Sequence, residues 1–422
     1  MTHDTTLLVY FDGEQVATPR LMGTLTGTNV RGKELFSFEF EESWLKDKTL
    51  RSFDPDLQLY SGRQYAPQGK DTFGIFLDST PDRWGRMLLD RRELIRAREE
   101  GRSPRSLFET DYLMGVYDES RMGALRLKRT ADGPFLDDDS SLCSPPWTSL
   151  RDLEYAALQI EQDPEVNDSR WLRMLIHPGS SLGGARPKAN VLDAAGHPWI
   201  AKFPSRNDRK DVGAWEAVCM ELARRCGITV SEWKLLKLNS PHHTFLSKRF
   251  DRTDTGRRLQ FTSAMTLLGY TDGADATTGA SYLELAEWIM QNCYDVERNL
   301  RQLYTRIAFN VAVSNCDDHL RNHGFLYTPK GWTLSPAYDL TPDAYGTDLK
   351  LCINETDSAL DYALVLSIAP YLGIPVGEAQ AILATVQQET SRWRTVATSL
   401  GIPRSEQEQL QPAFDPTRKQ QI

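Results

Sequence analysis

Hydrophobic and polar residues follow two different periods along this chain of 422 residues, and the change of period divides it into regions. In the first part, apolar runs at 7–11 and 35–40 are rich in the aliphatic and aromatic residues typical of β-strands. Residues 84–100 combine helical spacing with many charges, which predicts a helix with a solvated face. Residues 1–130 are therefore expected to form an N-terminal α/β region.

Helical periodicity dominates from residue 149 onward. Between the two parts, residues 131–148 form a polar, acidic stretch with three prolines, which is typical of a linker. The expected fold class is α+β, with a mainly α-helical C-terminal region. Its main helical runs are expected at 282–291, 296–312, 359–372 and 376–400, and strand pairs at 189–203 and 324–334.

Composition narrows the class of protein. A hydrophobic content of 40% over 422 residues can bury one large or two ordinary cores. A net charge of -9 argues against direct, general affinity for nucleic acid, whose phosphates bind basic surfaces. Six cysteines without a C-x-x-C pair are expected to be reduced thiols. The chain lacks an 18-residue apolar run and a signal-peptide pattern, so a cytoplasmic protein without membrane association is expected.

A cluster of Asn, Asp and His at 315–322 is the strongest chemical signal. Asp317 is followed five residues later by Asn322 and 22 residues later by Asp339. This spacing repeats the catalytic base, metal-binding amide and metal-binding carboxylate of protein kinases. Such oxygen ligands suit Mg²⁺, which is usually held by few protein groups together with substrate phosphates. The alternative is local, because Asp and Asn also favour turns and helix caps.

The surroundings of this cluster favour the functional interpretation. An apolar helical run through Leu303, Ile307 and Val311 ends at the cluster, so a buried helix would deliver the polar groups. A predicted hairpin at 324–334 follows and would place Asp339 just beyond its end.

A second candidate site lies upstream, in the glycine-rich segment 179–188. Glycines allow backbone N–H groups to turn toward an anion, although a simple turn beside a strand is the alternative. The hairpin that follows carries Lys202, which could reach phosphates or be a surface lysine. A helix at 211–226 presents Glu216 beside its apolar face, either as an ion-pair partner for Lys202 or as a solvated edge residue.

Five sequence motifs occur in the order found in the HipA-type toxin kinases, and the chain therefore resembles that family. They are SSLGGARPKA, WIAKFP, SKRFDR, NCDDHLRNHG and SPAYDL. The resemblance extends to LVYFDGEQVATPRLMGTL, FLDSTPDRWGR and RMGALRL in the N-terminal part. It implies a protein-kinase-like bilobal fold for residues 149–422, with a nucleotide-binding hairpin at 179–252 and a helical lobe at 253–422.

The resemblance also implies an activity and partners. It implies an ATP- and Mg²⁺-dependent serine/threonine protein kinase, a toxin that acts on a translation component such as an aminoacyl-tRNA synthetase. A helix-turn-helix antitoxin is implied as a partner, with DNA contacted only through it. Two other functions stay open: phosphorylation of a small molecule on the same scaffold, and a non-catalytic corepressor role with a DNA-binding partner.

Roles carry over to matching residues. Asp317 would be the catalytic base, Asn322 and Asp339 would hold Mg²⁺, and His319 would either contact phosphate or brace the loop. The segment 247–252 matches the hinge, where backbone groups near Lys248 and Phe250 would meet adenine. The implied ATP-binding residues are Ser181, Leu182, Gly183, Gly184, Ala185, Lys188, Lys202, Glu216, Lys248 and Phe250.

One serine of the glycine-rich loop matches the family's site of inhibitory autophosphorylation. Ser181 is the aligned residue, and Ser180 is the adjacent alternative. A phosphate there would compete with ATP and repel it by like charge. In contrast, nothing in the chemistry of FLDSTPDRWGR suggests catalysis, so a structural role is expected for that motif.

Overall fold

The computed structural model describes residues 4–47, 52–136, 144–162, 174–175, 184 and 186–419. Its contacts divide the chain into two units. Unit 1 consists of Met1–Arg206 and Asp251–Thr271, and unit 2 consists of Asn207–Phe250 and Asp272–Ile422. Because both units combine helices with strands, the expected α+β class is confirmed.

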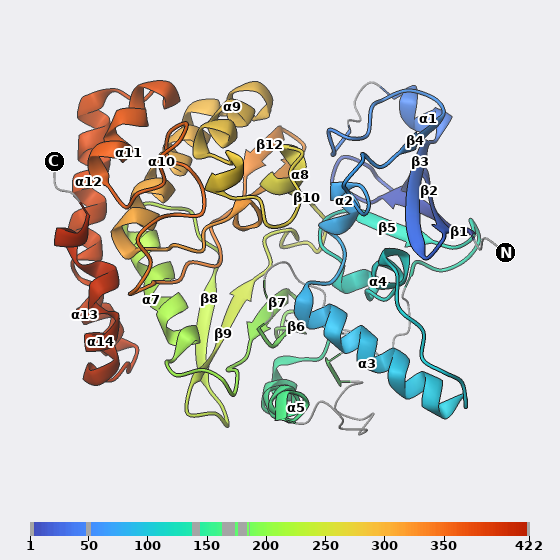
Figure 1. The fold of residues 1–422 in the computed structure, drawn as a ribbon, viewed down its shortest axis with the longest axis horizontal. Coiled ribbons are helices and arrows are strands. Elements are labelled where there is room, and N and C mark those ends of the chain that lie inside the picture. The colour runs from blue at the N-terminus through green and yellow to red at the C-terminus, as the bar shows by residue number, and fades with distance from the viewer. Residues whose placement is uncertain are drawn as a thin grey trace. The chain divides into compact units, whose positions relative to one another are not determined.

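An antiparallel sheet of five strands organises the first part of unit 1 (Figure 1). The strand β1, which lies between β2 and β5 in this sheet, buries Leu7, Val9 and Phe11 completely, which accounts for the apolar run in the sequence. Both strands expected at 7–11 and 35–40 are present. In spatial order the strands are β4 (Arg63–Tyr65), β3 (Lys33–Phe40), β2 (Arg20–Val30), β1 (Asp4–Phe11) and β5 (Leu125–Lys128).

The long helix of unit 1 is α3 (Arg83–Glu99), which confirms the charged helix expected near 84–100. It starts where the Asp82 carboxylate accepts a hydrogen bond from the Gly85 N–H, an N-cap that also suits the helix dipole. The other elements are α1 (Glu42–Leu45), α2 (Gly74–Leu77), α4 (Glu109–Met114), α5 (Leu150–Gln162), β6 (Lys188–Leu192), β7 (Pro198–Lys202), β10 (Gln260–Ser263) and α8 (Ala264–Leu267).

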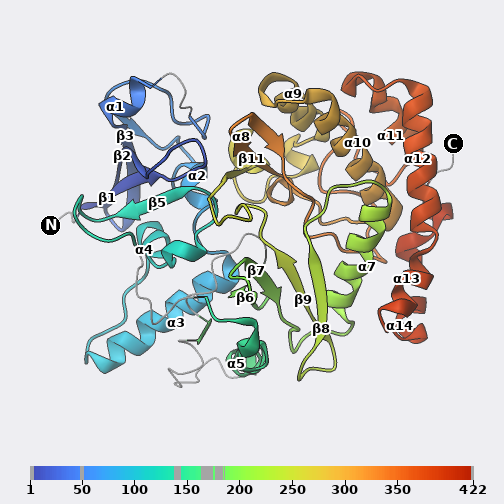
Figure 2. The same ribbon diagram turned by 180° about the vertical axis from the view of Figure 1, so that it is seen from behind.

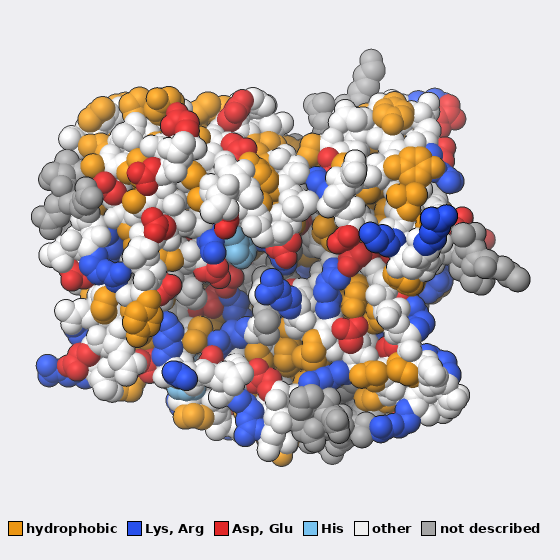
Figure 3. All heavy atoms as spheres, in the orientation of Figure 1, with side chains coloured by type: hydrophobic (Ala, Val, Ile, Leu, Met, Phe, Trp, Pro, Cys, Tyr) orange, Lys and Arg blue, Asp and Glu red, His pale blue; other side chains and the backbone are white. Residues whose placement is uncertain are grey.

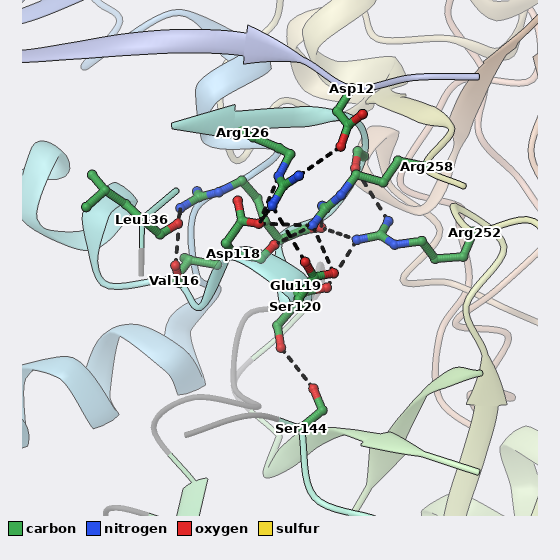
Figure 4. A network of polar contacts seen from close by, with 12 residues as sticks. Asp12, Val116, Asp118, Glu119, Ser120, Arg126, Leu136, Ser144, Arg252 and Arg258 are labelled. Carbon is green, nitrogen blue, oxygen red and sulfur yellow. Dashed lines mark hydrogen bonds and ion pairs between the residues drawn. The ribbon is translucent and has the colours of Figure 1, made fainter. Parts of the chain in front are cut away.

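Residues 251–271 belong to unit 1, although the sequence placed 253–422 together in a helical lobe. Buried polar contacts explain the difference (Figure 4). Arg258 donates to the Asp118 carbonyl at 2.9 Å, and Arg252 donates to the Arg121 carbonyl at 2.9 Å. The buried Asp78 carboxylate accepts from the N–H and the hydroxyl of Ser263. Such long-range pairing leaves no trace in local periodicity. The other expected boundaries, including the 131–148 linker, stay predictions.

Unit 2 is mainly helical, and α10 (Val296–Val313) is its most buried helix. It contacts α9 (Tyr282–Asn292), α11 (Tyr362–Ile368) and α12 (Val376–Thr390), as Figure 2 shows. The expected hairpin at 324–334 is confirmed as β11 (Gly324–Thr328) and β12 (Gly331–Leu334). The remaining elements are α7 (Val212–Arg225), β8 (Trp233–Lys237), β9 (His243–Lys248), α13 (Trp393–Ser399) and α14 (Arg404–Leu410).

Two helical runs differ from expectation. The run at 376–400 is broken into α12 and α13, because the hydroxyls of Thr390 and Ser391 donate to carbonyls of the preceding turn. The break also allows Trp393 to stack on Phe414, with ring centroids 4.6 Å apart. The run at 359–372 starts only at Tyr362, where Asp361 caps α11, and it ends in a 3₁₀ turn at Ala369–Leu372.

Cys219, Cys226, Cys293, Cys316 and Cys352 are free thiols, while Cys143 lies outside the described part. Among the described helices, none has the length and apolarity needed to cross a lipid bilayer.

Candidate functional site

The candidate base loop begins where α10 ends. Ser314 adopts a left-handed backbone with φ 50°, which stops the helix. The next residue, Asn315, is fully buried and donates from Nδ2 to Asn310 Oδ1 at 3.1 Å. Asp317 follows at the exposed tip of this anchored turn. The buried helix therefore presents one carboxylate to solvent from a rigid base.

The neighbouring Asp318 has the opposite environment. Its carboxylate is buried and accepts from Tyr282 Oη at 2.5 Å, Asn310 Nδ2 at 2.8 Å and His323 Nε2 at 2.7 Å. Burial by itself raises the pKa of Asp318, but the charge and hydrogen bond of His323 and the hydroxyl of Tyr282 lower it overall. Asp318 is thus an ionised structural anchor beside the candidate base.

Asn322 is tied directly to the loop that carries Asp317. Its side chain is nearly buried, and Nδ2 donates to the Asp317 carbonyl at 3.1 Å. The Asn322 N–H donates to the His319 carbonyl at 2.8 Å, which closes a 3₁₀ turn. His319 is half-buried, and its Nδ1 has no hydrogen-bond partner among the described residues. The backbone of His319 therefore braces the loop, while its ring leaves one nitrogen for another contact.

Asp339 lies five residues after β12 and has an unusual backbone. Its φ is 59°, in the left-handed region that a residue with a side chain rarely adopts. Just before it, the Tyr338 hydroxyl donates to the Arg321 carbonyl at 2.7 Å. Just after it, the Thr341 N–H donates to Asn315 Oδ1 at 3.4 Å. These contacts join the Asp339 segment to the base loop on both sides, and backbone strain of this kind is concentrated at functional sites.

A cavity of about 730 Å³ opens beside Asp317. Three further carboxylates, Asp275, Asp343 and Asp348, line it together with Lys350. Cys316 also faces this cavity, and burial with nearby acidic groups raises the pKa of its thiol to about 12. Since a protonated thiol is a poor nucleophile, Cys316 is not suited to covalent catalysis.

The glycine-rich segment is described only in part. Ser180, Ser181, Leu182, Gly183 and Ala185 lie outside the described residues.

The strands that follow form the expected hairpin. Gly184 has φ 77°, a conformation that glycine adopts readily. In the β6–β7 hairpin, Lys188 is the register partner of Lys202. Lys188 is buried and forms an ion pair with Asp82 at 2.6 Å, so its ammonium group is already engaged. Lys202 is half-buried.

The remaining predicted residues lie in unit 2. Glu216 is buried on α7, which begins at the Asp211 cap as expected. Its ion pair with Lys202 would join the two units and stays a prediction. The Lys248 N–H donates to the Glu232 carbonyl at 2.8 Å, and contact of other backbone groups near Lys248 with adenine stays a prediction. The Phe250 ring packs against Tyr338, with centroids 5.4 Å apart.

Sequence reasoning missed the groups that hold the site in place. Asn310 is a polar residue inside an apolar helical run, a signal that could have identified it as an internal anchor. The contact of Asp318 with Tyr282 spans 36 residues and the pairing of Asp82 with Lys188 spans 106, so neither has a local signal. In the described part of the chain, no group of three or more His, Cys, Asp or Glu side chains is arranged to hold a metal ion.

Comparisons with known proteins agree with this architecture. A putative kinase of Haemophilus influenzae is 26% identical over 213 residues, which cover 45% of this chain. The match spans 62% of the length of that relative.

In the crystal structure of a complex of HipA, HipB and operator DNA from Shewanella oneidensis MR-1, one chain shares the fold. The TM-score is 0.61 at 17% identity, covering 98% of this chain and 96% of that one. The family model of the HipA-like C-terminal domain matches residues 180–405, which is more than half of the sequence. The chain therefore belongs to the HipA family.

Proposed function

We propose that this protein is an ATP-dependent serine/threonine protein kinase. The observation that carries the proposal is the exposed Asp317 in the lining of a cavity, on a loop anchored to a buried helix. A base that accepts a proton from a bound hydroxyl needs both access and fixed geometry. Asp317 has both access and fixed geometry, whereas the carboxylate of Asp318 is buried and accepts three internal hydrogen bonds.

The proposed metal site consists of Asn322 and Asp339. Because Asn322 Nδ2 donates to the Asp317 carbonyl, its amide oxygen is the atom suited to a cation. Together with the Asp339 carboxylate it offers two oxygen donors, a set that fits Mg²⁺ bound mainly through nucleotide phosphates. Mg²⁺-ATP would supply the phosphoryl group and neutralise its developing charge.

Nucleotide binding is proposed for the β6–β7 hairpin and the segment before it. Lys202 would contact the phosphates and pair with Glu216, and Gly184 with its neighbours would surround the phosphates. Inhibitory autophosphorylation on Ser181, or on the adjacent Ser180, belongs to the same proposal. Its test is mass spectrometry of the protein after incubation with Mg²⁺-ATP, and unmodified serines would contradict it.

The cavity beside Asp317 is the proposed acceptor site. Its lining has four carboxylates against the single Lys350, so it favours an acceptor with Lys or Arg near the reacting hydroxyl. A protein acceptor such as an aminoacyl-tRNA synthetase and a helix-turn-helix antitoxin that contacts DNA are proposed from the family resemblance. The Shewanella HipA complex with HipB and operator DNA supports such a partner. A cytoplasmic location is part of this proposal.

The cavity volume also keeps a second function open. About 730 Å³ is within the range of small-molecule sites, so a metabolite hydroxyl could be the acceptor. A third function, corepression without catalysis, predicts stabilisation by Mg²⁺-ATP without turnover.

One experiment separates these functions. The wild-type protein and Asp317→Asn are incubated with labelled Mg²⁺-ATP and cell lysate, and protein and small-molecule fractions are analysed separately. We expect label in a discrete lysate protein with the wild type and none with the variant. Glu355→Gln, an exposed change on the same unit, serves as the matched control and should remain active. Label only in small molecules would favour the metabolite kinase, and no label would favour the corepressor.

A further inference from the structure

A buried ion pair links the start of α3 to the start of β6. Asp82 Oδ2 lies 2.6 Å from Lys188 Nζ. The two side chains are 0% and 2% exposed, so water screens their attraction very little. Asp82 belongs to the FLDSTPDRWGR motif, and Lys188 is the last residue of the glycine-rich segment.

The first turn of α3 holds both the side chain and the backbone of Lys188. Asp82 uses Oδ1 to cap the helix through the Gly85 N–H and Oδ2 to bind the lysine. Two residues later, Trp84 Nε1 donates to the Lys188 carbonyl at 3.1 Å. The turn itself is anchored, since Arg86 binds the Glu109 carboxylate through two hydrogen bonds at 2.6 and 2.7 Å. Lys188 is thus clamped to a rigid element.

The clamp sits where it can control the nucleotide hairpin. Lys188 and Lys202 are register partners at the open end of the β6–β7 hairpin. The Phe203 N–H then donates to the Pro187 carbonyl at 2.8 Å, which extends this pairing beyond the ladder. Holding Lys188 therefore fixes both the point where the glycine-rich segment joins the sheet and the strand position of Lys202.

We propose that Asp82 and Lys188 are a positioning pair for nucleotide binding, and that Lys188 is not itself a phosphate ligand. This inference rests on the proposed function, in which the hairpin binds ATP. Moving the Lys188 ammonium group to a phosphate would break its ion pair with the buried Asp82 carboxylate, and breaking a buried ion pair is strongly destabilising in proteins. Lys202, half-buried on the partner strand, keeps the role of phosphate-binding lysine.

A double-mutant cycle tests the proposal. Asp82→Asn, Lys188→Met and the double variant are compared for the Kd of a fluorescent ATP analogue with Mg²⁺, the KM values for ATP and acceptor, and the unfolding midpoint. We expect each single variant and the double variant to weaken ATP binding by about tenfold, with similar losses because one contact is removed in every case. The KM for the acceptor should stay within about twofold of wild type.

Two further variants separate positioning from simple loss of stability. Lys188→Arg keeps the ion pair and should retain ATP affinity close to that of the wild type. Leu25→Ala leaves a cavity beneath the five-stranded sheet of the same unit and removes none of the contacts of Asp82, Trp84 or Lys188, so it should lower the unfolding midpoint while ATP affinity is kept. The double variant of Asp82 and Lys188 replaces both charges, so no lone buried ion threatens folding.

The outcomes distinguish this inference from the proposed function. If Lys188→Met lost ATP affinity while Asp82→Asn kept it, Lys188 would be a phosphate ligand and the positioning proposal would be overturned. Wild-type ATP affinity in the folded double variant would overturn it as well. Failure of the wild-type protein to bind Mg²⁺-ATP at all would overturn the proposed function and this inference together.

Discussion

Adjacent residues in the base loop have opposite physical roles. Asp317 is exposed and available for chemistry, whereas Asp318 is buried under three hydrogen-bond donors. The difference arises because neighbouring residues leaving a helix point in different directions, and only one direction leads to solvent.

The buried member of this pair yields a stability prediction. Asp318→Asn should lower the free energy of unfolding by about 3 kcal/mol or more, since it leaves the His323 ring without its charged partner. Asp317→Asn, at an exposed position, should change it by less than about 0.5 kcal/mol. Urea unfolding measures both, and equal effects would contradict the assignment.

The pH dependence of the unfolding free energy follows from the direction in which the pKa of Asp318 is shifted. The pKa of Asp318 is lower in the folded protein than its ordinary value of 3.8. Its contribution is therefore present above that value and is lost as the pH falls below it. The difference in unfolding free energy between the wild type and Asp318→Asn should shrink in that acid range and stay constant at neutral pH.

Lys419 provides a second prediction at the scale of a residue. Its buried Nζ donates to the carbonyls of Ala312 and Ala413, both at 2.6 Å, and burial lowers its pKa to about 7. A neutral amine has two N–H donors, which these two carbonyls satisfy.

The pKa of Lys419 is lowered in the folded protein, as is that of Asp318, so both shifts make stability rise with pH, but that of Lys419 acts above neutral pH. Because the folded pKa lies below the ordinary value of 10.5, the unfolded chain binds more protons between about 7 and 10.5. The wild type should therefore gain stability relative to Lys419→Met as the pH rises from 7 to 9. Unfolding midpoints at several pH values test this, and parallel pH profiles would rule it out.

At the scale of elements, the base loop and the segment after Asp339 are packed closely enough to constrain the candidate site. A Cβ on Gly346 would overlap Cys316 Sγ and lie only 2.7 Å from Cys316 Cβ. Because Cys316 is the residue before Asp317, a clash that displaces Cys316 also displaces the candidate base.

Gly346→Ala should therefore reduce phosphotransfer by at least about tenfold, since small displacements of reacting groups are costly. Gly377→Ala is the matched control, because nothing lies within 4 Å of its added Cβ in the first turn of α12. It should preserve activity and raise stability by about 0.5–1 kcal/mol. Activity assays and thermal unfolding measure both variants. Full activity of Gly346→Ala would contradict the prediction, because it would mean that the loop accommodates the added methyl group without displacing Asp317.

For the whole molecule, net charge predicts how the chain interacts with DNA. The net charge is -9, and acidic and basic side chains are interspersed on the face shown in Figure 3. Affinity for DNA depends on a basic surface that releases counterions from the phosphates.

The purified chain alone should therefore leave duplex DNA unbound at about 150 mM salt, a concentration that already screens weak surface contacts. Retention of DNA is expected only when a helix-turn-helix partner is added. Fluorescence anisotropy with and without such a partner is the measurement. Binding by the chain alone, weakening steeply with salt, would show a basic site of its own.

Local sequence patterns were sufficient to predict most helices and strands and to recognise the family. The strand at 7–11, the helix at 211–226 and the hairpin at 324–334 follow from side-chain period and turn residues, which act over a few neighbours. The spacing of Asp317, Asn322 and Asp339 could also be recognised, because the two loops of the candidate site lie close together in the sequence.

Only the tertiary structure decided which of these polar groups are buried and what they bind. The burial of Asp318, the pairing of Asp82 with Lys188 and the place of residues 251–271 in unit 1 depend on segments tens to more than a hundred residues apart. A lysine beside a glycine-rich segment has the same sequence whether its ammonium group faces a phosphate or a buried carboxylate. Its role is set by the partner that folding brings to it, because the cost of an unpaired buried charge depends on three-dimensional surroundings and not on neighbours in the chain.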